Sequence, residues 1–207
     1  MGTAVITGAG SGMGRATAEL YLERDWQVIA VDVSDNPGIE SANLHWVKAD
    51  VRNRESLEAA LAPAITAAGG QIDAVANIAG VFPPTTLETF TEENFRFIFD
   101  VNVLGVLNVT AASVSHMNPG SAVVNFASVD GFTVSRGQLL YGASKSAVIM
   151  ITKSLALELA PKGIRVNGIA PGWVATPGNA ATGRMEEAAK SIPIGRVAQP
   201  SEIAEWV

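Results

Sequence analysis

The sequence predicts an α/β fold in which helices flank a doubly wound parallel sheet. Short segments rich in β-branched residues alternate with longer segments of helical periodicity, and this alternation is typical of βαβ units. A glycine-rich turn joins the first predicted strand to the first predicted helix. Apolar residues make up 48% of the 207 residues and charged residues only 16%, which favours a sheet that is buried on both faces.

Six strands are predicted from short runs of β-branched residues bounded by turn residues. They lie at 3–7, 27–31, 44–47, 74–76, 122–126 and 164–169. Four helices are predicted between them from the spacing of apolar residues. They lie at 13–24, 54–68, 91–114 and 141–159. Right-handed crossovers between the strands then place helices on both faces of the sheet.

The helix boundaries follow from the residues at their ends. The Gly-Gly pair at 69–70 ends the second helix, and Thr91 with the two acids after it begins the third. Pro161 and Gly163 end the fourth helix. Ser201 is the predicted N-cap of a short final helix. No linker, repeat or low-complexity segment is visible, so we expect one domain over 1–207.

Charge and cysteine content argue against several classes of function. The net charge is −6 and no run of Lys or Arg occurs, so neither a nucleic-acid partner nor a membrane partner is indicated. Cysteine is absent, and His45 and His116 lack the spacing of metal ligands, so no metal is assigned. No signal peptide is visible, and charged residues interrupt the most apolar later stretch, 147–159. A cytoplasmic protein is expected.

The turn after the first strand contains Gly8, Gly12 and Gly14. The pyrophosphate of a dinucleotide needs backbone N–H donors and a close approach at a helix N-terminus, and glycine permits both. An ordinary strand-to-helix turn is the alternative, but the strand before the glycines and the helix after them favour a dinucleotide. No Lys-Ser or Lys-Thr pair follows, which disfavours a P-loop nucleotidase.

Asp32 stands at the end of the second predicted strand, 18 residues after Gly14. A carboxylate at this position accepts hydrogen bonds from both hydroxyls of the adenosine ribose and repels a 2′-phosphate. The neighbouring residues Ser11 and Val33 supply no cation for such a phosphate. The sequence therefore favours NAD over NADP as the cofactor.

The order and spacing of the motifs resemble the short-chain dehydrogenase/reductase family over essentially the whole chain. The turn from Thr7 to Gly14 matches the family's T-G-x-x-x-G-x-G pattern, and Asp50-Val51 resembles its Asp-Val pair at the adenine. The segment 77–80 resembles its N-N-A-G motif, with Ile78 in place of the second Asn. The resemblance implies a Rossmann-type fold. The glycine turn and the resemblance together assign the following residues to the cofactor: Gly8, Ser11, Gly12, Met13, Gly14, Asp32, Asp50, Val51, Asn77, Ala79, Gly80, Tyr141, Lys145, Pro171, Gly172, Val174 and Thr176.

The catalytic set of the family is matched as well. Ser128 lies 13 residues before Tyr141, which is the family's usual spacing, and Tyr141 with Lys145 forms its Y-x-x-x-K motif. Asn102 corresponds to the family's helix asparagine, and the resemblance implies that it holds a water connecting Lys145 to solvent. The expected catalytic residues are Asn102, Ser128, Tyr141 and Lys145.

These residue types suit the oxidation of an alcohol, which requires hydride transfer to the cofactor and removal of the hydroxyl proton. A tyrosine with an ordinary pKa near ~10 is a poor base at neutral pH. Lys145, on the same helix face as Tyr141, and the oxidised nicotinamide are expected to lower that pKa. Ser128 is expected to hydrogen-bond the substrate oxygen. The predicted function is an NAD-dependent oxidoreductase that interconverts a secondary alcohol and a ketone.

The sequence leaves other interpretations open. Taken singly, Tyr141 and Lys145 match a surface helix pair, and Ser128, Asn102 and Asp32 match turn or helix residues. A catalytically silent NAD-binding sensor or interaction module is a second function. A nucleotide-sugar epimerase or dehydratase, which shares Y-x-x-x-K, is a third. An assay of cofactor reduction across a panel of alcohols separates the first two.

The resemblance also implies partners. A homodimer or homotetramer is expected, through the long helices around Asn102 and Tyr141. The segment at about 174–194 resembles the family's variable substrate loop, and its apolar residues suggest an uncharged small molecule. Steroids, sugars, cyclic alcohols and acyl chains all remain open as substrates. The family usually continues past the last helix into another parallel strand, which we expect to be absent here.

Overall fold

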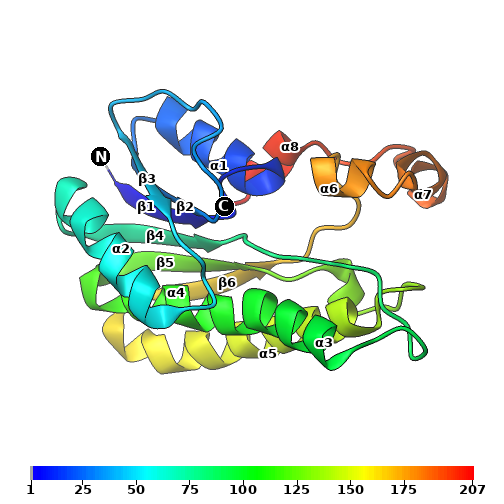
Figure 1. Ribbon diagram of the computed structural model, residues 1–207. Helices are drawn as coiled ribbons and strands as arrows, with labels where there is room; N and C mark the ends of the chain where they lie inside the picture. The colour runs from blue at the N-terminus through cyan, green and yellow to red at the C-terminus, as the bar shows by residue number, and fades with distance from the viewer. Residues whose placement is uncertain (1) are drawn as a thin grey trace.

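The computed structural model describes residues 2–207 and contains one six-stranded sheet (Figure 1). Its strands are β1 (Thr3–Thr7), β2 (Gln27–Asp32), β3 (Leu44–Lys48), β4 (Ile72–Asn77), β5 (Met117–Phe126) and β6 (Arg165–Ile169). They lie in the order β3-β2-β1-β4-β5-β6, and every neighbouring pair is parallel. The order reverses between β1 and β4, and in doubly wound sheets a ligand crevice opens at the carboxyl ends of the strands at such a point.

Helices cover both faces of this sheet, as predicted. They are α1 (Gly12–Glu23), α2 (Arg54–Ala67), α3 (Glu92–Phe99), α4 (Gly105–Ser113), α5 (Leu139–Leu159), α6 (Pro177–Ala180), α7 (Met185–Ser191) and α8 (Pro200–Ala204). In Figure 1, α1 and α8 lie above the sheet, whereas α2, α4 and α5 lie below it. The short helices α6 and α7 project beyond the end of the strands. The predicted α/β class is therefore confirmed.

Separate hydrophobic cores lie on the two faces of the sheet, because successive side chains of a strand point to opposite faces. Within β1, Val5 packs in the core that includes Leu57 of α2 and Val109 of α4. Its neighbour Ile6 packs in the other core, with Ala18 of α1. Strands that are buried on both faces explain the nearly continuous apolar runs in the sequence.

The predicted helix at 91–114 is present but is not a regular α-helix. Thr91 is its N-cap, and the Thr91 hydroxyl accepts a hydrogen bond from the backbone N–H of Asn94 at 3.1 Å. Between α3 and α4, residues Asp100–Leu104 form a π-helical segment that contains Asn102. Such segments inside α-helices occur frequently at functional sites. Spacing of apolar residues does not reveal this irregularity.

By length and composition alone, the helical run Glu92–His116 is able to cross a membrane. The core helices of water-soluble domains pass the same test, and this run packs against the sheet through Val106 and Val109, which are 4% and 1% exposed. These contacts place one side of the run in the core.

The last helix begins two residues earlier than predicted. Its N-cap is Gln199, not Ser201, and Pro200 occupies its first turn. The backbone N–H of Gln199 donates to the Glu202 carboxylate at 2.7 Å. Proline fits the first helical position because its missing N–H has no partner there in any case. The prediction of Ser201 as the cap was therefore wrong.

Candidate active site

Two adjoining cavities open at the carboxyl ends of the strands. One, of about 530 Å³, follows the glycine turn and the ends of β2 and β4, and the other, of about 260 Å³, lies between the end of β5, the start of α5 and the segment after β6. Met13, Gly80, Phe82 and Thr176 line both cavities. The first cavity is called the cofactor cleft and the second the substrate cavity below.

The glycine turn needs its glycines for two distinct reasons. Gly8 and Gly12 have φ angles of 69° and 55°, in the left-handed region that favours glycine. Gly14 lies at the start of α1, where a Cβ atom would stand 2.1 Å from the carbonyl oxygen of Gly8. The backbone of the turn therefore lies in close contact with the start of α1. Such close backbone contact at a helix N-terminus is what the binding of a pyrophosphate requires.

Asp32 ends β2 and lines the cofactor cleft. Its Oδ2 atom accepts a hydrogen bond from the backbone N–H of Gly10 at 2.9 Å. Its Oδ1 atom accepts from the backbone N–H and the hydroxyl of Ser34, at 2.9 Å and 2.7 Å. These donors hold the carboxylate at the edge of the cleft, and the glycine turn is tied to β2 through it.

The structure brings most of the other predicted cofactor residues to the cavities. Ser11, Asp50, Val51 and Ala79 line the cofactor cleft. The predicted residues that line the substrate cavity are Tyr141, Lys145, Pro171, Gly172 and Val174.

Asn77, which the resemblance assigns both to support of the sheet and to the cofactor, lines neither cavity. It is 3% exposed, and its Nδ2 atom donates to the Thr110 hydroxyl at 3.1 Å and to Asn125 Oδ1 at 2.8 Å. These bonds join β4 to α4 and to β5 inside the protein. Asn77 therefore supports the sheet, because its side chain is directed away from the cleft.

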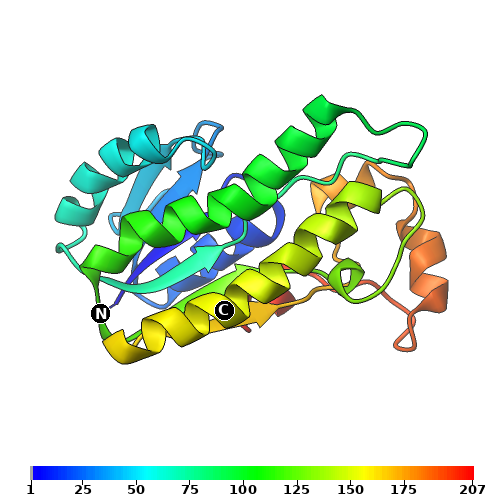
Figure 2. The same ribbon diagram turned by 90° about the horizontal axis from the view of Figure 1, so that it is seen from below.

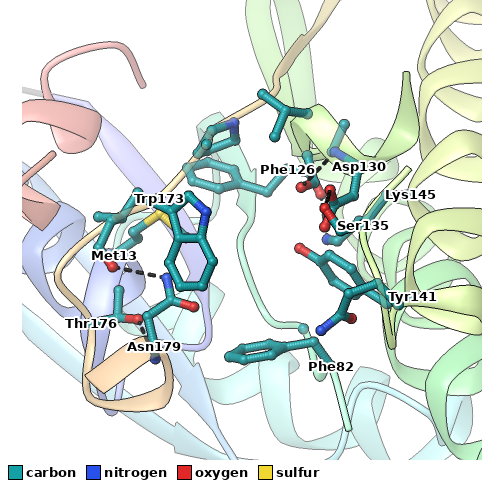
Figure 3. A pocket seen from close by; sticks show the side chains of 18 of the residues that line it. Met13, Phe82, Phe126, Asp130, Ser135, Tyr141, Lys145, Trp173, Thr176 and Asn179 are labelled. Carbon is teal, nitrogen blue, oxygen red and sulfur yellow. Dashed lines mark hydrogen bonds between the residues drawn. The ribbon is translucent and has the colours of Figure 1, made fainter. Parts of the chain in front are cut away.

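Ser128, Tyr141 and Lys145 come together on one wall of the substrate cavity, as Figure 3 shows for Tyr141 and Lys145. Ser128 follows β5, where its hydroxyl accepts a hydrogen bond from the backbone N–H of Asp130 at 3.2 Å. Tyr141 and Lys145 lie one turn apart on α5. The Lys145 ammonium donates to the carbonyl oxygen of Phe126 at 2.6 Å and stands 5.7 Å from the centre of the Tyr141 ring.

The pKa of Tyr141 is raised above its ordinary value in the protein alone. Burial raises the pKa of Tyr141, a hydrogen bond with Ser128 lowers it in part, and the Asp130 carboxylate raises it further. Removal from water disfavours the charged phenolate. The predicted lowering of the pKa includes the positive charge of the oxidised nicotinamide and stays a prediction. The spacing of residues shows a cation four positions away but does not show the burial of the hydroxyl.

Burial also lowers the pKa of Lys145, to about 8. The cause is desolvation of an ammonium that is only 5% exposed. The group keeps a hydrogen bond but has no carboxylate partner among the ion pairs of residues 2–207. Lys145 is thus held at an energetic cost in the position that the family motif requires.

Replacing Lys145 with methionine is expected to stabilise the cofactor-free protein at pH 7. Below pH 8 the folded state must bury a charge that the unfolded state keeps in water, at a cost of roughly 3 kcal/mol for a shift from 10.5 to about 8. Loss of the hydrogen bond to Phe126 offsets about 1 kcal/mol of the gain. As pH rises from about 8 to 10.5, the folded protein loses this proton first, so the advantage of the variant shrinks.

Urea unfolding of both proteins at pH 7 and pH 10 measures this effect. Lys153→Met, on the exposed side of the same helix, is the control and should change stability equally at both pH values. A Lys145→Met variant that is less stable than the parent at pH 7 would contradict the prediction.

Asn102 lines neither cavity but lies directly behind them. It is fully buried in the π-helical segment, and its Oδ1 atom accepts a hydrogen bond from the backbone N–H of Val81 at 2.8 Å. Its Nδ2 atom donates to the Val81 carbonyl at 2.9 Å and to the Ser144 hydroxyl at 3.0 Å. Asn102 therefore joins the loop after β4 to α5, next to Lys145.

Sequence reasoning missed several residues of the substrate cavity. Asp130, Gln138 and Asn179 line it, and none was singled out. Gln138 lies three residues before Tyr141 at the start of α5, so its helical spacing was an available signal. Trp173, which follows the Pro171-Gly172 pair, lines the cavity opposite Tyr141 (Figure 3).

The fold and the site together define an α/β protein with a doubly wound parallel sheet and a Ser–Tyr–Lys group beside the cleft at the carboxyl ends of its strands. The family model described as "Enoyl-(Acyl carrier protein) reductase" matches residues 8–207. The chain belongs to the short-chain dehydrogenase/reductase family, and it is an oxidoreductase of that family.

Individual relatives and a solved structure agree with this assignment. "Oxidoreductase UcpA" of Salmonella typhimurium is 37% identical, over 98% of this chain and 84% of the relative. "3-oxoacyl-[acyl-carrier-protein] reductase FabG" of Thermotoga maritima is 36% identical, over 98% of this chain and 87% of the relative. The crystal structure of 3-ketoacyl-(acyl-carrier-protein) reductase from Brucella melitensis complexed with NADH superposes with a TM-score of 0.91 at 30% identity, covering 99% of this chain and 88% of that one.

Proposed function

We propose that the protein is an NAD-dependent oxidoreductase that interconverts a secondary alcohol and a ketone. The observation that carries the proposal is the placement of Tyr141 and Ser128 in a cavity that adjoins the Asp32 cleft. A relative described as a 3-oxoacyl reductase and a structural neighbour complexed with NADH support this chemistry.

The residues of the cleft fit a dinucleotide. The glycine turn leaves room for a pyrophosphate at the N-terminus of α1, and Asp32 presents a carboxylate for the ribose hydroxyls. Thr176 and Gly80, which line both cavities, would border the nicotinamide end. When bound there, the nicotinamide supplies the hydride chemistry, accepting a hydride in alcohol oxidation and donating one in ketone reduction.

The protein's own side chains would transfer the hydroxyl proton and bind the substrate oxygen. In oxidation, the Tyr141 phenolate would take the proton of the substrate hydroxyl, and in reduction the Tyr141 hydroxyl would return it. Ser128 would hydrogen-bond the same substrate oxygen, where charge changes in the transition state. Lys145 would favour the phenolate by its positive charge and hold the nicotinamide ribose, and Asn102 would position the helix that carries them.

Asp32→Asn is expected to shift the cofactor preference from NAD towards NADP. A carboxylate about 4–5 Å from a 2′-phosphate opposes it by roughly 3–4 kcal/mol at an effective dielectric constant of ~20. Solvent screening reduces this figure, so we expect the ratio of kcat/KM for NAD to that for NADP to fall by roughly ten- to a hundredfold. Steady-state kinetics with both cofactors measures the ratio.

Glu40→Gln is the matched control, because it removes one carboxylate charge from an exposed residue that lines neither cavity. Its cofactor ratio should equal that of the parent. A parent protein that prefers NADP would contradict the assignment of NAD.

Reduction of NAD by a diverse panel of secondary alcohols tests the activity itself. Turnover of at least one alcohol is expected. Binding of NAD without turnover of any alcohol, or of the matching ketones with NADH, would instead favour an NAD-binding module.

A homo-oligomer is proposed as the assembly. Phe95, Leu104 and Leu107 of the α3–α4 run are 44%, 42% and 38% exposed, and Met150 and Leu157 of α5 are 60% and 80% exposed. Figure 2 shows that these two long helices run along the same face of the molecule. A second copy of the chain would cover this apolar surface. A cytoplasmic location is proposed as well.

A further inference from the structure

The cofactor cleft continues beyond Asp32 to the residues that follow β3. In the strand order β3-β2-β1-β4, the N-terminus of α1 follows β1, and Asp32 ends β2. A dinucleotide with its pyrophosphate at α1 and its ribose at Asp32 would therefore direct its base past β2, towards the end of β3. This part of the cleft, called the β3 wall below, is lined by Ala49, Asp50, Val51, Arg52 and Phe97.

The Asp50 carboxylate of the β3 wall is already occupied by Arg52. Asp50 Oδ1 accepts hydrogen bonds from the backbone N–H and from Nε of Arg52, at 2.9 Å and 3.0 Å. Asp50 Oδ2 accepts from Nε and Nη2 of Arg52, at 2.9 Å and 2.6 Å. An ionised carboxylate has about four acceptor positions. These contacts therefore leave Asp50 no free position for a donor on a ligand, unless Arg52 is released.

The backbone that carries this pair is fixed to the helix layer. Asn108 of α4 is 6% exposed, and its Nδ2 atom donates to the Val51 carbonyl at 2.8 Å. Gly105, at the start of α4, lies so close that a Cβ atom there would stand 2.7 Å from the Val51 side chain. Arg52 is the next residue along the chain, so its side chain extends from a firmly held position.

The guanidinium of Arg52 is held by an aromatic ring as well as by Asp50. Its central carbon stands 5.5 Å from the centre of the Phe97 ring, which belongs to α3. The Arg52 side chain is nevertheless 43% exposed. An arginine guanidinium is planar and weakly hydrated and stacks on aromatic faces, unlike the compact ammonium of lysine. Arg52 therefore offers a flat cation to an aromatic group in the cleft.

We propose that Arg52 binds the base of the dinucleotide by stacking on it, and that Asp50 positions Arg52 and forms no hydrogen bond with the base. The β3 wall then selects a flat aromatic base and tolerates different groups at the edge of that base. An amino group on the base, which a free carboxylate would bind, is not needed. This inference rests on the proposed binding of a dinucleotide, since it concerns the same cleft.

Dissociation constants of NAD and of nicotinamide hypoxanthine dinucleotide test the proposal. Hypoxanthine has a carbonyl oxygen where adenine has its amino group, so a carboxylate that binds the amino group would reject it. We expect the parent protein to bind both dinucleotides with constants within about threefold of each other. Arg52→Ala should weaken the binding of both by about five- to a hundredfold, which is the size of a lost base-stacking contact.

Two further variants separate stacking from charge and from the edge of the base. Arg52→Lys keeps the positive charge without the plane, so it should weaken both dinucleotides nearly as much as Arg52→Ala. Asp50→Asn should leave the ratio of the two constants unchanged. Arg54→Ala is the matched control, because Arg54 pairs with Glu58 and lines none of the described cavities. It should bind NAD as the parent does.

Three results would overturn the proposal. Unchanged NAD affinity in Arg52→Ala would exclude a contact between Arg52 and the base. Parental affinity in Arg52→Lys would show that charge alone is sufficient. A preference of the parent for NAD over the hypoxanthine dinucleotide by about tenfold or more, lost in Asp50→Asn, would show that Asp50 binds the amino group.

Measuring binding keeps this inference separate from the proposed function. Binding of NAD without turnover of any alcohol would refute the oxidoreductase function and leave the base measurement intact. Turnover together with a strong preference for NAD over the hypoxanthine dinucleotide would overturn this inference alone. A protein that binds neither dinucleotide would overturn both.

Discussion

Tyr141→Phe is expected to lower turnover by roughly 10²–10⁴-fold and to leave NAD binding nearly unchanged. The substitution removes only the hydroxyl that exchanges a proton with the substrate, and general acid–base catalysis contributes a factor of this size. The residues of the cofactor cleft are untouched. Because burial raises the pKa of Tyr141 in the protein alone, the oxidation rate of the parent should rise with pH until the phenolate predominates. That rise should be absent from the residual rate of the variant.

Tyr21→Phe is a matched control, since Tyr21 is the other of the two tyrosines in the chain. It is also buried, at 9% exposure, and packs edge-on against Trp26 with ring centres 4.9 Å apart, away from both cavities. Turnover in this variant should match the parent. Near-parental turnover of Tyr141→Phe would refute the proton-transfer role.

Gly14→Ala is expected to have the largest effect on the fold and on cofactor binding together. The new Cβ would stand 2.1 Å from the Gly8 oxygen and 2.5 Å from the Gly8 carbonyl carbon, and both are backbone atoms. Overpacking of this kind costs typically about 1–3 kcal/mol, and here the turn and α1 must separate. We expect a fall in Tm of roughly 5–10 °C. We also expect NAD affinity to fall by at least about tenfold, because the N–H donors of the turn are displaced.

Gly168→Ala adds the same methyl group where space exists, since its Cβ would meet Thr152 at 3.5 Å. This control in β6 should change Tm and NAD affinity little. Thermal unfolding and calorimetric titration with NAD measure both quantities. Unchanged NAD affinity in Gly14→Ala would show that the turn does not hold the pyrophosphate.

The secondary structure was predictable from local patterns to a large extent. All six predicted strands, the four helices predicted between them and the short final helix are present, and β1 has the predicted bounds of Thr3–Thr7. β5 extends five residues further towards the N-terminus than predicted, because Met117 pairs with Ile72 across a register shift. That pairing depends on a strand that is distant in the sequence, so no local pattern predicts it.

The candidate site was predictable where motifs identify residues, and less so where their surroundings decide their role. The motifs placed Ser128, Tyr141 and Lys145 in one group, and the structure brings them to one cavity. Asn77 carries a family motif as well, yet its side chain is bonded inside the sheet to Thr110 and Asn125. Those two residues are remote in the sequence, and their proximity arises only when β4, β5 and α4 pack.

The features that depend on neighbouring residues were predictable from the amino-acid sequence alone. The positive φ angles of Gly8 and Gly12, the alternation of strands and helices, and the helix spacing of Tyr141 and Lys145 all depend on neighbours within a few residues. The raised pKa of Tyr141 and the unpaired oxygen of Gln138 were decided by the tertiary structure. Desolvation and the supply of hydrogen-bond partners are set by everything that surrounds an atom, and distant segments of the chain contribute most of those surroundings.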